Sequence, residues 1–147
     1  MKKVDLYTDG ACSGNPGVGG WGVVLIYKGH IKELSGYFDY TTNNRMELFS
    51  IIQGLKSLKE KCEVTVYSDS AYAVDSFNKG WVRKWESNGW KTGEKEPVKN
   101  KDLWTDLLLT VEKHDVTFIK VKGHSDNLYN NRCDEMARAE IKKCRSL

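Results

Sequence analysis

The chain has 147 residues, and its 23 lysines and arginines against 20 aspartates and glutamates give a formal net charge of +3. This length suits one domain with a sizeable core, and so mild a charge does not by itself indicate a nucleic-acid partner. There is no apolar run long enough for a membrane span, no signal-peptide pattern and no paired spacing among the four cysteines. We therefore expect a cytoplasmic protein with reduced thiols.

The amino-terminal half of the chain predicts an antiparallel meander followed by a helix. Apolar and polar residues first alternate with the period of a strand, and apolar residues then recur at helical spacing after the potential caps 41–44. The expected elements of this half are strands at 4–9, 20–27 and 31–40 and a helix at 45–59. Asp9 falls at the end of the first strand, before a segment rich in turn-forming residues.

The carboxyl-terminal half predicts strands and helices in alternation. The expected elements are strands at 64–69 and 116–122 and helices at 70–77, at 102–113 and from about 132 onwards. The segment 80–101 is rich in tryptophan and carries six cations against three acidic residues, an excess equal to the net charge of the whole chain. With no internal repeat, linker or low-complexity tract, residues 1–147 are expected to form one mixed α/β domain.

Four carboxylates occupy similar places, at strand ends or helix starts: Asp9, Glu47, Asp69 and Asp134. Strand ends are where open α/β sheets hold their sites, and Glu47 lies on the flank of the buried stripe of its helix. Each carboxylate also has a structural interpretation. Asp9 could cap a turn, Glu47 could form a capping box with Asn44, and Asp69 could be a helix N-cap. Asp134, in the first turn of its expected helix, could interact with the helix dipole.

If these carboxylates converge, their mutual repulsion requires a cation to offset it. Oxygen-only ligands favour a hard ion such as magnesium or manganese and disfavour zinc. Two such ions roughly 4 Å apart can activate a water molecule and stabilise a leaving oxygen in phosphoryl transfer. Spacing alone does not establish that the four residues meet, because they come from distant segments.

Several segments resemble those of bacterial type-one ribonuclease H. They are TDGACSGNPG at 8–17, TTNNRMEL at 41–48, SDS at 68–70 and KGH at 122–124, together with 89–92, 97–100 and 132–137. The resemblance covers nearly the whole chain. It implies a ribonuclease H-like α/β fold, with a five-stranded mixed sheet of three antiparallel strands and then two strands parallel to the first. Helices would cover both faces, and a basic protrusion at about 80–101 would be inserted.

The resemblance also implies an activity, the hydrolysis of the RNA strand of RNA–DNA hybrids to leave 3′-hydroxyl and 5′-phosphate ends. Catalysis would use two Mg²⁺ ions, for which Mn²⁺ substitutes, held at the positions of Asp9, Glu47, Asp69 and Asp134. His124 matches the mobile histidine of the family, which assists proton transfer or product departure, and imidazole titrates near physiological pH. Because water is the nucleophile, the ribose 2′-hydroxyl is free to distinguish RNA from DNA.

The implied substrate contacts are Cys12, Asn15, Asn43 and Asn44 for the RNA strand, Thr42 for a DNA phosphate, and Trp81 and Trp85 for the DNA strand. Structural roles remain open for most of them, in turns, at a helix start or in packing. The chain departs from more basic relatives at Glu86, Glu94 and Glu96, and also at Ala71 and Asn131. We expect a monomer that requires no membrane and no protein partner.

Two other functions fit the same fold. A non-catalytic hybrid-binding module is disfavoured because all four carboxylates and His124 are present. A nuclease acting on DNA, of the strand-transfer or resolvase type, is disfavoured by the asparagine motif and by the tryptophan-rich segment.

Overall fold

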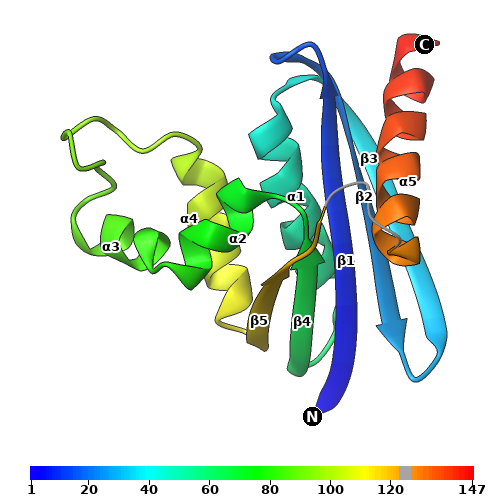
Figure 1. Ribbon diagram of the computed structural model, residues 1–147, viewed down its shortest axis with the longest axis horizontal. Helices are drawn as coiled ribbons and strands as arrows, with labels where there is room; N and C mark the ends of the chain where they lie inside the picture. Colours follow the sequence, from blue (N-terminus) through cyan, green and yellow to red (C-terminus); the bar gives the residue numbers. More distant parts are fainter. Residues whose placement is uncertain (123–126) are drawn as a thin grey trace.

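The structure, a computed structural model that describes residues 1–122 and 127–147, contains a five-stranded sheet in the order β3-β2-β1-β4-β5 (Figure 1). Its elements are β1 (Lys2–Ser13), β2 (Gly17–Tyr27), β3 (His30–Thr41), α1 (Asn43–Lys56), β4 (Cys62–Ser68), α2 (Ala71–Asn78), α3 (Trp81–Ser87), α4 (Lys101–Val111), β5 (Asp115–Lys120) and α5 (Leu128–Arg145). The first three strands are antiparallel, and β4 and β5 run parallel to β1. The expected mixed sheet is confirmed.

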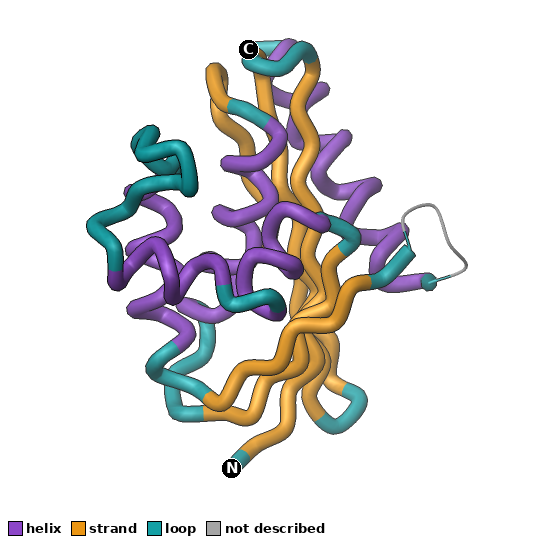
Figure 2. Tube along the Cα trace, turned by 60° about the vertical axis from the view of Figure 1, so that its left-hand side comes forward, coloured by secondary structure: helices purple, strands orange, loops and turns teal. Residues whose placement is uncertain are grey.

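Helices cover both faces of this sheet, as expected. In Figures 1 and 2, α5 lies on one side of the sheet, and α1 and the other helices lie on the opposite side. The side chains of β2 show why. Val23 and Leu25 belong to the large core cluster under α1, whereas Val24, which points the other way, packs with Met136 of α5.

The large core cluster extends from the sheet through α1 to α4. Leu6, Ile51 and Leu55 are fully buried where α1 crosses β1, and Trp104 of α4 is fully buried as well. Burial of each such side chain contributes on the order of 2 kcal/mol to stability. None of the helices in the described ranges has the length and apolar character needed to cross a lipid bilayer.

Two element boundaries differ from the sequence prediction in ways that matter for the site. β1 does not end at Asp9 but continues to Ser13, because β2 pairs with it along this whole stretch. α5 begins at Leu128 rather than near residue 132, because Asn127 caps it by accepting a hydrogen bond from the Asn130 N–H at 2.9 Å.

The segment 80–101, which we call the protrusion, consists of α3 and a loop folded mainly on itself. The Val98 N–H donates to the carbonyl of Trp90 at 3.0 Å, and Lys91 forms a β-bridge with Pro97. Val82 of α3 is buried, and the ring of Trp85 meets the buried ring of Trp104 edge-on, with 5.8 Å between the ring centroids. The protrusion is therefore anchored to the core by side chains from α3.

Candidate active site

The site lies where β1 and β4 part. Their parallel pairing ends at Tyr7 and Tyr67, although β1 remains paired with β2. Asp9 lies two residues beyond Tyr7, and Asp69 directly follows β4. The prediction that the first strand ends at Asp9 was wrong. What ends just before Asp9 is the pairing with β4, and this gives a carboxylate at the carboxyl end of two neighbouring parallel strands.

Glu47 reaches the same place because α1 packs directly on β1 at Gly10. A Cβ on Gly10 would lie 2.4 Å from the carbonyl carbon of Met46 and 2.5 Å from the Glu47 nitrogen, so only glycine fits. This contact lets the Gly10 N–H donate to Glu47 Oε1 at 3.0 Å. This bond to β1, together with an exposed fraction of only 3% for Glu47, confirms that the carboxylate lies over the sheet.

The capping roles considered for Glu47 and Asp69 are wrong. Thr42 caps α1, and its Oγ1 accepts a hydrogen bond from the Arg45 N–H at 3.3 Å. Ser70 caps α2, and its Oγ accepts from the Ala73 N–H at 3.1 Å. Among the residues that the structure describes, neither carboxylate caps a helix, so both remain available to a ligand in the site.

Asp134 is positioned by close contact between α5 and β2 on the other face of the sheet. A Cβ on Gly22, the residue paired with Asp9, would lie 2.5 Å from the carbonyl oxygen of Cys133. Because α5 starts at Leu128, Asp134 lies in its second turn, and the first-turn position expected from the sequence was wrong. Its carboxylate pairs with Arg138 at 3.0 Å.

The four carboxylates line one cleft of about 430 Å³. Ligand oxygens of Asp9, Glu47 and Asp69 lie within 4.8 Å of one another. Asp134 lines the cleft but lies outside this closest group. The structure thus brings together, in one cleft, four residues that are separated by 38, 22 and 65 positions along the chain.

The electrostatics of the cleft are unfavourable without a cation. Burial raises the pKa of the Asp9 carboxyl to about 7, and the charge of Asp69 adds to this effect. Burial, followed by the charge of Asp9, raises the pKa of Glu47 well above its usual range. Within residues 1–122 and 127–147, Asp134 alone among the four carboxylates has an ion-pair partner. The low dielectric of the site therefore makes like-charge repulsion costly.

The residues present fit a divalent cation with a preference for oxygen. Glu47 Oε2 is buried and receives no N–H or O–H donor from the described residues. An all-carboxylate donor set matches magnesium or manganese, whereas zinc favours nitrogen and sulfur ligands. Cys133 is buried and adjacent to Asp134 in the sequence. Its thiol donates a hydrogen bond to the carbonyl oxygen of Tyr7 at 3.3 Å, and burial raises the pKa of this thiol. Cys133 therefore remains a protonated thiol, whereas a cysteine that binds a metal ion does so as a thiolate.

The predicted RNA contacts gather around the start of α1. Asn43 and Asn44 are exposed and line the cleft. Asn15 Oδ1 accepts a hydrogen bond from the Asn43 N–H at 3.1 Å, and Cys12 Sγ lies 3.4 Å from the carbonyl oxygen of Thr41. Asn15 and Cys12 do not line the cleft, but these contacts hold the hairpin between β1 and β2 beside it.

The tryptophans lie apart from the carboxylates, on α3 of the protrusion (Figure 1). Trp81 is 43% exposed, with Lys79 Nζ 5.3 Å from its ring centroid, while Trp85 is half-buried against the core. Packing therefore accounts for much of Trp85 and little of Trp81. His124, also expected at the site, lies outside the described residues.

Sequence reasoning missed other residues of the cleft. Tyr72 lines it from the first turn of α2, and Asn130 lines it from α5. Asn130 precedes Asp134 by four residues and so shares its helix face, a spacing that could have indicated its place. For Tyr72 the signal was weaker, since an aromatic residue early in a helix usually serves packing.

This fold, with a cluster of carboxylates at the carboxyl ends of two neighbouring parallel strands, places the protein in a class of enzymes that depend on divalent metal ions. A family model described as RNase H matches residues 1–142, and the chain belongs to this family. Ribonuclease H of Acetivibrio thermocellus is 63% identical over 143 residues, covering 97% of each chain. Ribonuclease H of Caldicellulosiruptor saccharolyticus is 61% identical over 145 residues, covering 99% of this chain and 100% of the relative.

Solved structures support the same relationship. LC9-RNase H1, described as a type 1 RNase H with the type 2 active-site motif, superposes with a TM-score of 0.86 at 29% identity, covering 97% of this chain and 74% of that one. LC11-RNase H1 in complex with an RNA/DNA hybrid gives a TM-score of 0.75 at 26% identity, covering 97% of this chain and 99% of that one.

Proposed function

We propose that residues 1–147 form one ribonuclease H domain that hydrolyses the RNA strand of RNA–DNA hybrids and leaves 3′-hydroxyl and 5′-phosphate ends. The observation that carries the proposal is the close approach of Asp9, Glu47 and Asp69, whose ligand oxygens lie within 4.8 Å of one another in an open cleft. The complex of LC11-RNase H1 with a hybrid supports the choice of substrate. The protrusion is the inserted substrate-binding part of the domain.

The four carboxylates Asp9, Glu47, Asp69 and Asp134 would together hold two Mg²⁺ ions, and Mn²⁺, which has the same preference for oxygen, would substitute. When bound, such ions supply an activated water molecule and offset the negative charge on the phosphate and the leaving oxygen. The orphaned Oε2 of Glu47 and the repulsion between the charges of Asp9 and Asp69 both favour occupation by a cation.

The chain contributes a rigid arrangement of these oxygens. Asp9 lies in a strand paired with β2, and Glu47 is fixed through its Oε1 by the Gly10 N–H, whereas its buried Oε2 has no donor among the described residues. Asp134 comes from a helix packed onto glycines of β2. A site held in this way needs little reorganisation during the reaction, which is the main source of electrostatic catalysis.

The substrate residues surround this centre. Asn43 and Asn44 would read the RNA strand, since their amides both donate and accept hydrogen bonds and so match the ribose 2′-hydroxyl. Asn15 and Cys12 support that surface from the neighbouring hairpin, and Thr42 would contact a DNA phosphate.

Further from the centre, Trp81 and Trp85 would contact the DNA strand. His124 would assist proton transfer or product departure. Its replacement by alanine is expected to slow turnover without abolishing it, because the metal ions supply the principal stabilisation.

The enzyme would act as a cytoplasmic monomer without an obligatory protein partner. One chain supplies all four carboxylates of the cleft, so the proposed site is complete without a second subunit. All four cysteines are free, which suits a reducing compartment.

The experiment compares labelled RNA–DNA hybrid, double-stranded RNA and double-stranded DNA, each with magnesium and with a chelator. We expect cleavage of the hybrid alone, in magnesium alone, with 5′-phosphate on the downstream RNA product. Asp69→Asn should be inactive, and Asp39→Asn, which alters an exposed residue of β3, should retain wild-type turnover. Cleavage of double-stranded DNA, or full turnover by Asp69→Asn, would contradict the proposal.

A further inference from the structure

Asp134 stands on α5 and lies outside the closest group of carboxylates in the cleft. Its neighbour Cys133 is fully buried against the sheet, where it packs with Val24 of β2. Successive residues of a helix project about 100° apart, so the two neighbours of Cys133 project to opposite flanks of α5. Asp134 lines the cleft on one flank, and Arg132 extends to the edge strand β3 on the other.

Arg132 joins α5 to β3 through a bidentate ion pair. Its Nε and Nη2 donate to the two carboxylate oxygens of Glu33, at 2.6 and 3.0 Å. Two such bonds fix the orientation of the guanidinium as well as its distance, which a single contact does not do. Arg132 also pairs with Glu135, but this second partner lies on α5 itself and so does not connect the helix to the sheet.

α5 lies directly on the backbone of β2 beside this ion pair. A Cβ on Gly22 would lie 2.5 Å from the carbonyl oxygen of Cys133, and one on Gly20 would lie 2.1 Å from that of Ala137. With no side chains at these two positions to interlock with the helix, contacts on its flanks must resist rotation about its axis. A helix with side chains has a radius of about 5 Å, so a rotation of roughly 10° moves a side-chain end by about 1 Å. A displacement of this size can slow a reaction about a hundredfold.

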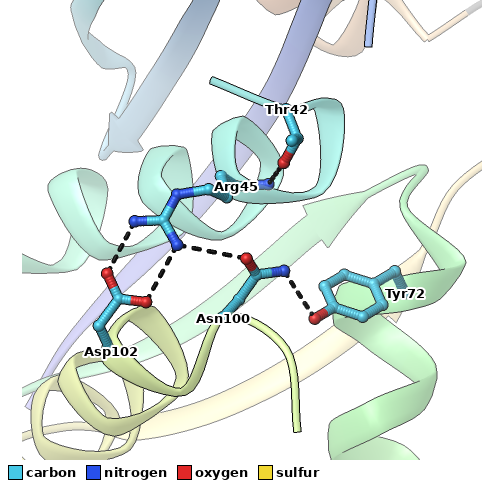
Figure 3. Close-up of polar contacts among 5 residues, drawn as sticks. All are labelled: Thr42, Arg45, Tyr72, Asn100 and Asp102. Atoms are coloured by element: carbon cyan, nitrogen blue, oxygen red, sulfur yellow. Dashed lines mark hydrogen bonds and ion pairs between the residues drawn. The ribbon is translucent and has the colours of Figure 1, made fainter. Parts of the chain in front are cut away.

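The same arrangement occurs on α1, which carries the other helix-borne carboxylate of the cleft, Glu47. Arg45 precedes Glu47 by two residues, the spacing found on α5, and Met46 between them is buried. Two nitrogens of Arg45 contact the two carboxylate oxygens of Asp102 on α4, at 3.0 and 2.7 Å (Figure 3). Each helix that brings a carboxylate to the cleft is therefore joined to a neighbouring element by a bidentate arginine two positions earlier.

We propose that Arg132 is a positioning residue for Asp134, and that its ion pair with Glu33 fixes the rotation of α5 at which this carboxylate reaches the metal ions. The inference rests on the proposed function, which assigns Asp134 as a ligand. Glu47 has a second restraint, a hydrogen bond from the backbone of β1, whereas the ion-pair partner of Asp134 is Arg138 of the same helix. The place of Asp134 therefore depends on the orientation of α5 as a whole.

An effect of charge alone predicts the opposite change in metal affinity. Arg132→Gln removes a positive charge two residues from Asp134, so by charge alone it should tighten the binding of a divalent cation. If Arg132 acts by position, the same variant frees α5 to rotate, and the cation binds more weakly. Arg132→Lys should weaken binding as well, because lysine keeps the charge but lacks the planar fork of donors.

Glu33→Gln and Glu135→Gln form a matched pair of variants. Each removes one negative charge from a carboxylate that binds the same arginine, but only Glu33 lies on the sheet. Glu135 adjoins Asp134 in the chain, so by charge alone Glu135→Gln should weaken cation binding at least as much. If position matters, Glu33→Gln should cause the larger loss, because it breaks the ion pair between α5 and β3.

The experiment measures the dissociation constant of Mn²⁺ for the full chain without substrate, from the electron paramagnetic resonance signal of the free ion. Thermal denaturation sets a temperature at which every variant is folded. Arg132→Gln, Arg132→Lys and Glu33→Gln should each bind Mn²⁺ about tenfold more weakly, the low end of the loss seen when a group that orients a ligand is removed. Turnover at low magnesium should fall in the same variants, while the KM for the hybrid remains unchanged.

A thermodynamic cycle with Asp134→Asn shows whether Arg132 acts through this carboxylate. Arg132→Gln should cost no further affinity in the Asp134→Asn background, because the ligand that it positions is absent. An equal loss in both backgrounds, or wild-type or tighter Mn²⁺ binding by Arg132→Gln alone, would overturn the positioning role. A loss in Glu135→Gln as large as in Glu33→Gln would overturn it as well. Wild-type Mn²⁺ affinity in Asp134→Asn would instead overturn the ligand assignment made in the proposed function.

Discussion

The cleft and the protrusion are built in opposite ways. The cleft is assembled from segments far apart in the chain, which meet through backbone contacts at glycines, and it buries like charges that repel. The protrusion is built largely from neighbouring residues, and its charged groups remain exposed to solvent. Chemistry therefore depends on long-range packing that few substitutions can preserve, whereas binding by the protrusion depends on a surface that tolerates change.

The largest expected difference between the two regions is in turnover. Asp9→Asn replaces one carboxylate of the cluster with a neutral amide. It should lower turnover by about 10²–10³-fold or more, with hybrid binding retained. Trp85→Ala, in the protrusion, should weaken binding through lost packing and leave turnover at saturating hybrid largely intact. Steady-state kinetics separate the two effects. Wild-type turnover in Asp9→Asn would contradict the assignment of catalysis to the cleft.

The second difference is in how the free energy of unfolding depends on pH, an effect that we expect from the cleft and not from the protrusion. The pKa of Asp9 is about 7 in the folded, metal-free protein and 3.8 in an ordinary environment. The folded state therefore holds this proton more tightly, and its contribution to stability is fully present below about pH 4 and lost as the pH rises to about 7.

Urea unfolding in chelator from pH 4 to pH 8 measures this effect, which is at most about 4 kcal/mol. Asp9→Asn should reduce the dependence to the part that belongs to Glu47, whose pKa is also raised by burial, and saturating magnesium should offset the loss at neutral pH because the ion binds only the folded site. A dependence in Asp9→Asn as steep as in the wild type would show that Asp9 is not its source.

Glycines give a third comparison. A methyl group on Gly10 would meet the backbone of α1 at 2.4 Å, so Gly10→Ala must displace the helix that carries Glu47. We expect a loss of about 1–3 kcal/mol in unfolding free energy together with a loss of activity. Gly89→Ala, in the protrusion, meets no atom within 4 Å and is strained only by its φ of 82°. It should cost about 1–2 kcal/mol and leave activity unchanged. Equal loss of activity in both variants would contradict the close-packing argument.

The same glycines explain how much of the molecule the sequence could predict. Strand alternation and helical spacing predicted all five strands and every helix of the described residues except α3, because these signals are local. The resemblance predicted the four carboxylates as a set. Their convergence was not predictable from pattern, because it depends on Gly10 and Gly22, and a glycine in a strand looks in sequence like a turn former. The contact between Arg45 and Asn100 joins residues 55 positions apart and leaves no periodic signal.

The smallest expected effect lies on the surface of the protrusion. Glu86 pairs with Arg83 at 3.2 Å on α3, and Arg83 also approaches Glu112 at 3.4 Å, so part of the positive charge of the protrusion is used within the protein. These pairs are exposed, and each contributes little to stability. Glu86→Lys should tighten hybrid binding and steepen its salt dependence, because an added phosphate contact releases further counterions. Turnover at saturation should not change, since the carboxylates are elsewhere.

Glu112→Lys is the matched control for this last comparison. It makes the same charge change beside the same arginine, but from the residue that follows α4 instead of from α3. If the hybrid lies along α3, Glu86→Lys should change the slope of affinity against salt more than Glu112→Lys does. Equal slopes for both variants would mean that only the overall charge matters. No change for Glu86→Lys would place residue 86 on a face turned away from the nucleic acid, and the protrusion would then bind through Trp81 and its lysines alone.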